Sequence, residues 1–246
     1  MQTPTRLLIT NAQIYTDEGV VSAGSLLVEE GLIKKIFVEN RVHDQLSENI
    51  EVIDGSHLNI IPGFIDGHIH GAAGADVMDA TSAALDTIAS VLPREGTTSF
   101  LATTITQKPQ NIEQALENVA HYKNKPGQAE LVGIHLEGPF IEKSKAGAQP
   151  TQYIIEPDIE LFKKWQTLSG SQIRTITLAP EHDKDGRFIQ YLNEEGVNVS
   201  AGHTAMNFTE TKQAVSHGIH QLTHLCNAMT GIHHRDIGAV GASFQL

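Results

Sequence analysis

The spacing of hydrophobic positions along the chain changes near Asn59. Before it, short apolar runs such as "RLLITNAQIYT", "GSLLVEEGLIKKIFVEN" and "IEVIDGSHLNI" are interrupted by Asn, Asp and Gly, and helical spacing is poor. Short runs rich in Val, Ile and Leu between turn residues are typical of β-strands. We therefore expect residues 1–58 to form a small β-sheet unit, and residues 59–246 to form a second domain.

From Asn59 onward, apolar strand-like runs alternate with runs whose apolar residues recur at helical spacing. Such alternation predicts an α/β fold with a parallel sheet, either open and doubly wound or closed as a (β/α)8 barrel. The expected helices lie at 81–96, 109–124, 158–170, 186–196 and 207–218. The expected strands lie at 59–70, 97–106, 129–140, 173–181, 197–204 and 220–229.

Composition narrows the class of protein. The 246 residues carry a formal net charge of −12, which argues against nucleic acid or an anionic membrane as the main partner. Cys226 is the single cysteine, so an intrachain disulfide is excluded and a reducing compartment is favoured. The N-terminus does not resemble a signal peptide, and no apolar run is long enough to span a membrane. We therefore expect a soluble cytoplasmic protein.

The stretch "PGFIDGHIHG" places His68 and His70 two residues apart at the end of an apolar run. Residues i and i+2 of a strand point to the same face, so both imidazoles would project side by side, as metal ligands do. An isolated pair of this kind is weak evidence, because many such pairs lie on solvated faces. The metal interpretation therefore needs further ligands nearby.

Further ligand types fall at the ends of other expected strands, namely Glu137 in "HLEGPF", His203 in "SAGHTA" and His224 in "LTHLCNAM". Catalytic groups gather at the C-terminal ends of barrel strands. Each residue alone could be a hydrogen-bonded core residue, but five buried together without a cation would be costly. Four imidazoles and a carboxylate suit one or two borderline divalent cations, zinc or iron.

The sequence gives weaker evidence for a functional role of other polar residues. His135 shares a face with Glu137, and we favour a hydrogen-bonded interior residue over a ligand. Arg235 follows the sixth strand and suits an anion such as phosphate, although a surface arginine needs no such role. Asn227 could orient a polar ligand, and the glycine-containing loop after Glu137 suits a lid. We expect surface positions for His43, His57, His121 and His217.

Taken in order, "PGFIDGHIHG", "HLEGPFI", "KAGAQP", "LAPE", "SAGHT" and "THLCNAM" resemble the amidohydrolase superfamily. Within it they are similar to the N-acetylglucosamine-6-phosphate deacetylase family, which removes an acetyl group to give glucosamine 6-phosphate and acetate. The resemblance implies a distorted (β/α)8 barrel with a small β-sandwich built from both termini. It also implies a homodimer.

The resemblance also assigns roles to residues of this chain. Glu137, His203 and His224 match the ligands of the principal metal, and His68 and His70 match a pair that holds a second metal in some members. A further set matches positions that contact the amino-sugar phosphate substrate, with Arg235 reaching the phosphate across a subunit interface: Ala148, Asn227, Ala228 and Arg235.

The pattern departs from the family at its end. The family's acid/base aspartate lies on a later strand, and we expect it beyond Leu246, so that the chain is an N-terminal fragment without turnover of its own. Three alternatives stay open: a deacetylase of the galactosamine epimer, an inactive protein that binds metal or sugar phosphate, and a fragment that does not fold alone.

Overall fold

The computed structural model describes residues 6–38 and 50–246. Contacts between Cα atoms divide the chain into two compact units, Met1–Gly63 and Phe64–Leu246. The candidate metal ligands all lie in the second unit.

The first unit is a five-stranded sheet with the order β3-β2-β1-β4, in which β5 also pairs with β1. Alternate apolar side chains form its small core around Ala12, Ile14 and Leu26. The predicted β-structure is therefore present as one sheet. A β-sandwich would need a second sheet packed against it. The strands are β1 (Arg6–Thr16), β2 (Gly19–Glu29), β3 (Leu32–Phe37), β4 (Glu51–Asp54) and β5 (Asn59–Ile60).

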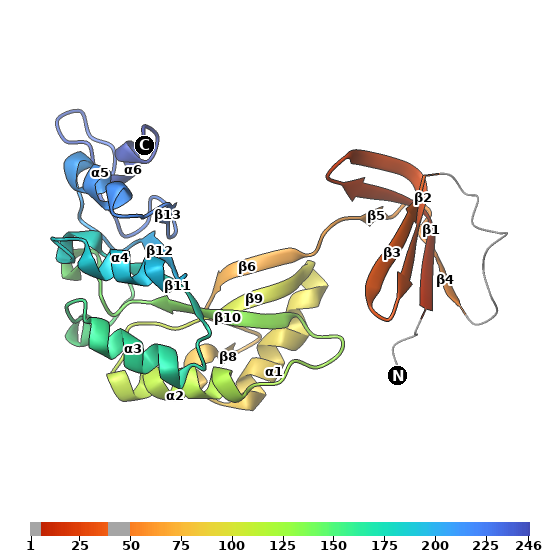
Figure 1. The fold of residues 1–246 in the computed structure, drawn as a ribbon, viewed down its shortest axis with the longest axis horizontal. Helices are drawn as coiled ribbons and strands as arrows, with labels where there is room; N and C mark the ends of the chain where they lie inside the picture. The colour runs from red at the N-terminus through yellow and green to blue at the C-terminus, as the bar shows by residue number, and fades with distance from the viewer. Residues whose placement is uncertain (1–5, 39–49) are drawn as a thin grey trace. The chain divides into compact units, whose positions relative to one another are not determined.

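The second unit is built on a curled, six-stranded parallel sheet in which the strands lie side by side in chain order (Figure 1). This arrangement confirms the α/β class and the parallel sheet. A two-stranded hairpin of β7 (Gly71–Ala72) and β8 (Ala75–Asp76) follows the first of these strands. The six strands are β6 (Phe64–Ile69), β9 (Thr97–Thr103), β10 (Glu130–Glu137), β11 (Ile173–Leu178), β12 (Asn198–Ala201) and β13 (Gln221–Leu222).

Five of the six helices in the described residues fall within the predicted segments, and several begin at a capping residue; the short helix at residues 239–242 was not predicted. The side chains of Thr81, Asp158 and Asn207 accept backbone N–H groups at the starts of three helices, and Gly96 closes the first helical segment in a left-handed conformation. The helices are α1 (Ser82–Val91), α2 (Pro109–His121), α3 (Ile159–Leu168), α4 (Arg187–Glu194), α5 (Phe208–Ser216) and α6 (Ala239–Ala242). Short 3-10 turns occupy Val77–Asp79, Leu92–Glu95, Lys143–Lys145, Thr151–Tyr153 and Pro180–His182.

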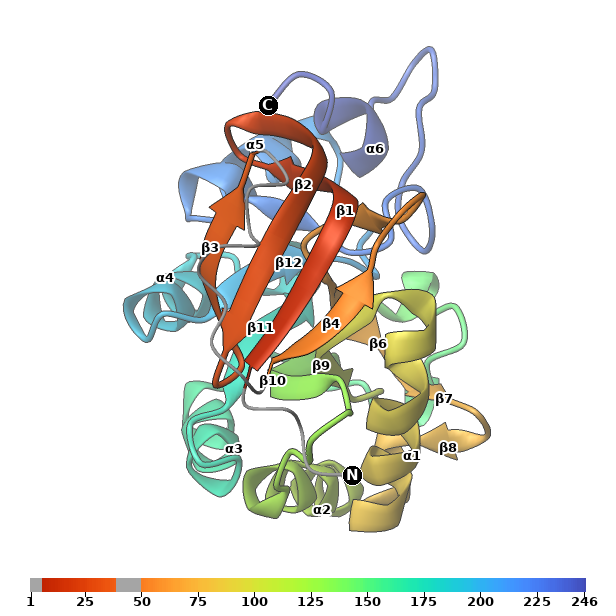
Figure 2. The same ribbon diagram turned by 90° about the vertical axis from the view of Figure 1, so that its right-hand side faces the viewer.

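The two faces of the sheet differ in chemistry because side chains alternate along each strand. On β10, Ile134 and Leu136 belong to the main hydrophobic core, which the helices along one side of the sheet help to bury (Figure 2). Trp165 of α3 is buried in this core and stacks on Phe140, with ring centroids 5.8 Å apart. The opposite face carries buried polar side chains, namely Thr103, His135, Glu137, Thr177 and Ser200.

All six expected strands are shorter than predicted, and two of them differ most. The run 59–70 is broken at Pro62 and Gly63, so that β5 joins the first sheet and β6 the second. The run 220–229 keeps only β13, because His224, Cys226 and Ala228 have φ values of 36°, 81° and 50°. Residues with positive φ leave the extended conformation of a strand, so regular pairing ends at Leu222.

Candidate metal site

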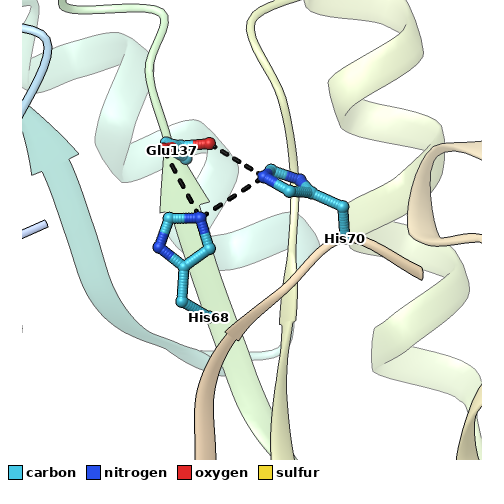
Figure 3. A group of neighbouring side chains, drawn as sticks. All are labelled: His68, His70 and Glu137. Atoms are coloured by element: carbon cyan, nitrogen blue, oxygen red, sulfur yellow. Dashed lines mark hydrogen bonds and ion pairs between the residues drawn. The ribbon is translucent and has the colours of Figure 1, made fainter. Parts of the chain in front are cut away.

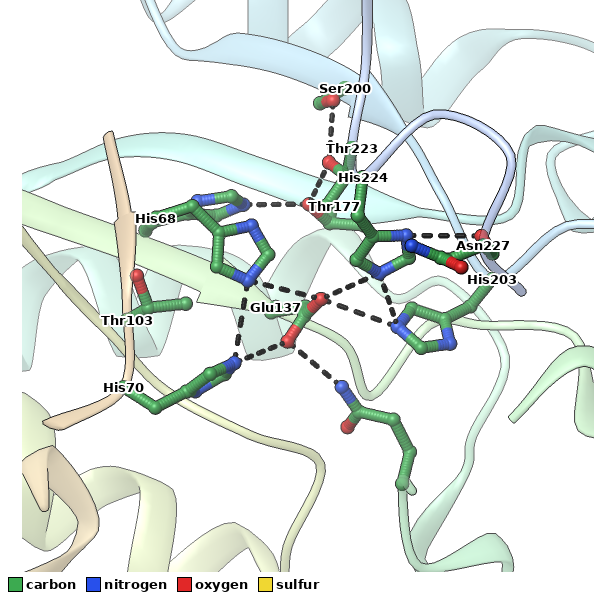
Figure 4. Close-up of polar contacts among 12 residues, drawn as sticks. His68, His70, Thr103, Glu137, Thr177, Ser200, His203, Thr223, His224 and Asn227 are labelled. Atoms are coloured by element: carbon green, nitrogen blue, oxygen red, sulfur yellow. Dashed lines mark hydrogen bonds and ion pairs between the residues drawn. The ribbon is translucent and has the colours of Figure 1, made fainter. Parts of the chain in front are cut away.

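Glu137 is the centre of a cluster of histidines at the C-terminal ends of the parallel strands (Figure 4). Its side chain is only 2% exposed, and its two oxygens face four imidazole rings. A buried carboxylate is costly unless cations or hydrogen-bond donors surround it. The neighbours of Glu137 therefore decide what this site can hold.

One group consists of Glu137, His203 and His224. The Nε2 atoms of both histidines lie 3.2 Å from Glu137 Oε1 and 3.0 Å from each other. His203 follows β12 and His224 follows β13, so the group joins the ends of β10 and of two strands that lie beyond its neighbour β11. These three residues present ligand atoms within 4.8 Å of one another, close enough for a single metal ion.

A second group uses the same carboxylate with His68 and His70 (Figure 3). His70 Nε2 lies 3.0 Å from Glu137 Oε2, and His68 Nε2 lies 3.5 Å from Oε1 and 3.3 Å from His70 Nε2. The rings project to the same side, as their spacing of two predicted. All five sequence-predicted ligands thus lie together, and Glu137 belongs to both groups.

Backbone carbonyls fix the tautomers of two of these rings. His203 Nδ1 lies 2.9 Å from the carbonyl oxygen of Lys145, and His224 Nδ1 lies 3.0 Å from that of Asn227. A carbonyl can only accept, so each ring must donate from Nδ1, which leaves the Nε2 lone pair of a neutral ring facing Glu137. This outer hydrogen bonding is typical of metal-binding histidines, and the set of nitrogen and carboxylate donors fits zinc or iron.

The electrostatics of the cluster favour a bound cation. Burial alone would raise the pKa of Glu137, but hydrogen bonds from His203, His224, His68 and His70 outweigh it and hold that pKa far below its usual range. In turn, hydrogen bonds to Glu137 raise the pKa of His70 and of His224. Without a metal ion, protons on the imidazoles therefore balance the buried carboxylate.

Gln149 completes the surroundings of Glu137, and sequence reasoning had not singled it out as a site residue. Its amide oxygen accepts the Thr106 N–H at 2.7 Å, which orients its NH₂ group toward Glu137 Oε2 at 2.9 Å. Gln149 is buried and follows the glycine-containing loop, so the "KAGAQP" motif was the available signal.

His135 is a buried, hydrogen-bonded residue, in agreement with the interpretation favoured from the sequence. Burial lowers the pKa of His135 to about 4, so the ring is neutral at neutral pH. Its Nε2 lies 2.6 Å from Thr177 Oγ1, which continues through Thr223 to Ser200 in a chain of hydroxyls.

The predicted substrate-contacting residues lie in two loops. An added Cβ at Gly147 would lie 3.8 Å from both Ala228 and the His203 ring, so the loop that carries Ala148 runs beside the first metal-ligand group. Asn227 accepts from His224 through its carbonyl, and its side chain is exposed.

Arg235 is also exposed, and its Nε lies 2.9 Å from His234 Nε2. Its loop borders a hollow of about 330 Å³ that Lys145, His233 and Asp236 help to line.

Several other histidines differ in exposure and in partners. His57 and His121 are exposed and His217 is half-buried, whereas His43 lies outside the described residues. His182 bridges two carboxylates, with nitrogens 3.0 Å from Glu142 and 3.1 Å from Glu156. Among residues 6–38 and 50–246, no helix combines the length and apolar character needed to cross a membrane.

Comparisons with known proteins agree with the fold. Residues 59–244 match the model of the Amidohydrolase family. N-acetylglucosamine-6-phosphate deacetylase of Bacillus subtilis (strain 168) is 44% identical over 241 residues, which are 96% of this chain and 60% of that protein. N-acetylgalactosamine-6-phosphate deacetylase of Escherichia coli O157:H7 is 35% identical over 229 residues, covering 91% of this chain and 60% of that protein.

A solved structure, that of N-acetylglucosamine-6-phosphate deacetylase from Pasteurella multocida, matches with a TM-score of 0.85 and 31% identity, over 98% of this chain and 62% of that one. The curled parallel sheet and the cluster of His and Glu side chains agree with this class of protein, and the chain belongs to the amidohydrolase family. Its relatives named above are deacetylases of amino-sugar phosphates, and the chain spans about 60% of their length.

Proposed function

We propose that this chain carries the metal centre of a deacetylase that hydrolyses N-acetylglucosamine 6-phosphate to glucosamine 6-phosphate and acetate. The observation that carries the proposal is the convergence of His203 and His224 on the buried Glu137. Relatives with this activity in their names, matched over nearly the whole chain, support the same substrate.

In this proposal Glu137, His203 and His224 hold the principal zinc or iron ion, and His68 and His70 with Glu137 hold a second. When bound, such an ion supplies a Lewis acid that lowers the pKa of water and polarises the acetamide carbonyl. The carbonyls of Lys145 and Asn227 keep the His203 and His224 lone pairs directed at it.

The substrate is held by loop residues in this proposal. The backbone at Ala148 and the pair Asn227 and Ala228 contact the sugar, and Arg235 binds the phosphate through its guanidinium. We propose that Arg235 acts across the interface of a homodimer, in a cytoplasmic enzyme. The six parallel strands would then be part of a (β/α)8 barrel, and the first sheet part of a β-sandwich.

The activity is tested with the protein as its gene encodes it, loaded with Zn²⁺ or Fe²⁺. Acetate release from N-acetylglucosamine 6-phosphate should exceed that from N-acetylgalactosamine 6-phosphate and from unphosphorylated N-acetylglucosamine. Faster release from the galactosamine epimer would support the alternative substrate. Tight binding without any acetate would support an inactive binding protein instead.

Hydrolysis also needs a group that takes a proton from water and delivers it to the departing amine. Our expectation of an aspartate beyond Leu246 is tested by reading the gene past that codon. A reading frame that supplies an aspartate at a later strand end would support the expectation, and a stop codon would contradict it.

The role of Arg235 is tested by Arg235→Ala. The variant should raise the KM for the phosphorylated substrate at least tenfold, because a charge-assisted contact to phosphate is lost. Arg94→Ala is the matched control, since Arg94 is exposed at the N-terminal end of β9, away from the metal ligands. An unchanged KM for Arg235→Ala would reject this role.

A further inference from the structure

Strand β6, which contains His68 and is followed directly by His70, is irregular near these histidines. Asp66 pairs with Phe100 of β9, but the next paired residue, Ile69, lies opposite Ala102. Three residues of β6 therefore advance against two of β9, which is the count of a β-bulge. Within the described sheet β6 is also an edge strand. The backbone hydrogen bonds between β6 and β9 therefore do little to fix the position of His68 beside Glu137.

Side chains provide support inside this bulge. Asp66 Oδ1 accepts the His68 N–H at 3.0 Å, and Thr103 Oγ1 accepts the Ile69 N–H at 2.9 Å. From β10, two strands away, the His135 ring reaches across the inner face and places Nδ1 2.9 Å from the carbonyl oxygen of Gly67. A carbonyl only accepts, so His135 donates from Nδ1 to the backbone directly before His68.

The other side of the His135 ring is anchored as well. With its proton on Nδ1, the neutral ring accepts at Nε2 from the Thr177 hydroxyl of β11. Thr177 in turn lies 2.6 Å from Thr223 Oγ1, which lies 2.7 Å from Ser200 Oγ of β12. All of these side chains are buried, so their hydrogen bonds restrict the ring to one orientation. The ring also lies edge-on to His68, with centroids 4.8 Å apart.

We propose that His135 is a positioning residue that holds the bulge of β6 so that His68 and His70 face Glu137. This inference rests on the proposed metal-binding function and goes beyond it, because His135 is not itself a ligand. Its hydrogen bond to Gly67 acts on the group of His68, His70 and Glu137. The group of Glu137, His203 and His224 comes from other strands and does not depend on that bond.

The test compares two polar replacements of His135. An Asn side chain ends where Nδ1 lies, so His135→Asn keeps a donor for Gly67, whereas the amide of His135→Gln ends near Nε2 and Thr177. Both variants bury a side-chain amide of similar polarity. A difference between their cobalt affinities therefore reports the position of the hydrogen-bond donor. Each is titrated with Co²⁺, whose visible absorption reports the number of bound ions, their affinity and their ligand geometry.

We expect His135→Gln to weaken cobalt binding about 10- to 100-fold at the group containing His68 and His70, the usual effect of losing an outer hydrogen bond. His135→Asn should restore most of the affinity and the spectrum. In a background where His68 and His70 are both alanine, the two variants should bind cobalt equally, at the Glu137, His203 and His224 group alone.

Other outcomes distinguish the positioning role of His135 from the proposed metal-dependent function. Equal cobalt affinities of wild type, His135→Asn and His135→Gln would overturn the positioning role while leaving the proposed function intact. The same loss in the background lacking His68 and His70 would also overturn it, because the effect would then be general. No cobalt binding by the wild type would overturn the metal-dependent function and, with it, this inference.

Discussion

The Nε2 atoms of His203 and His224 lie 3.0 Å apart, although each ring directs its Nδ1 to a backbone carbonyl. Two neutral rings in these tautomers point lone pairs at each other and at the ionised Glu137. Such an arrangement is repulsive unless a cation lies among the three groups, either a proton on one ring or a metal ion. The geometry of the ligands is therefore set by the backbone, before any ion binds.

Replacing Glu137 with Gln should strip the principal metal ion, because the amide is neutral and the buried negative charge is lost. We expect metal content after dialysis, measured by mass spectrometry, to fall to a small fraction of the wild-type value. Glu130→Gln provides the control, since Glu130 is exposed at the other end of the same strand. Equal metal content in Glu137→Gln and wild type would show that the ligand assignment is wrong.

The stabilisation that a metal ion provides should grow with pH. The folded-state pKa values of His70 and His224 are raised by Glu137, so proton-linked stability is present below about pH 6.5 and is lost as the pH rises through them. Metal binding needs both rings neutral, so the affinity for the metal ion increases as the pH rises. The difference in Tm with and without saturating Zn²⁺ should therefore increase between pH 5.5 and 8, and a constant difference would contradict this linkage.

Gln149→Leu should destabilise the fold and weaken metal binding together. The substitution leaves the buried Thr106 N–H without its acceptor and removes a donor from Glu137, at a cost of about 1–3 kcal/mol in the free energy of unfolding. Urea denaturation of the metal-free protein measures this change. Gln114→Leu, on an exposed position of α2, should change the same free energy by less than about 0.5 kcal/mol.

Trp165→Ala should be among the more damaging core substitutions. The side chain is fully buried, stacks on Phe140 and donates from Nε1 to Glu113 at 3.2 Å. Truncation to alanine should cost about 3–5 kcal/mol in the free energy of unfolding. Trp165→Phe should cost less because it retains the stacking, and similar losses for both would contradict the packing argument.

Much of the second unit was predictable from sequence because its periodicity is strong. All described helices but the short α6 fell within their predicted segments, and Glu137 ends its strand as "HLEGPF" suggested. The shortened sixth strand was not predictable from hydrophobicity, because its apolar residues continue while His224 and Cys226 turn to positive φ. The pattern of apolar residues does not reveal backbone handedness.

The outer contacts of the site were harder to predict than its ligands. Gln149 meets Glu137 only because a loop folds back from the end of β10, and a polar residue in a loop has no periodic signal. The carbonyl of Lys145 has no side-chain signature at all. The proximity of His68, His70, His203 and His224 to one carboxylate is what the structure adds, and their role as ligands stays a prediction.

The carboxylate of Glu137 belongs to both candidate groups, one on each side of it. An ion in one group and an ion in the other would therefore draw on the same negative charge, which makes their occupancies interdependent. Thermodynamic reciprocity requires that whatever factor the first ion applies to the affinity of the second, the second applies to the first. The sharing of one side chain thus turns two neighbouring positions into a coupled pair, whose stoichiometry depends on the concentration of free metal.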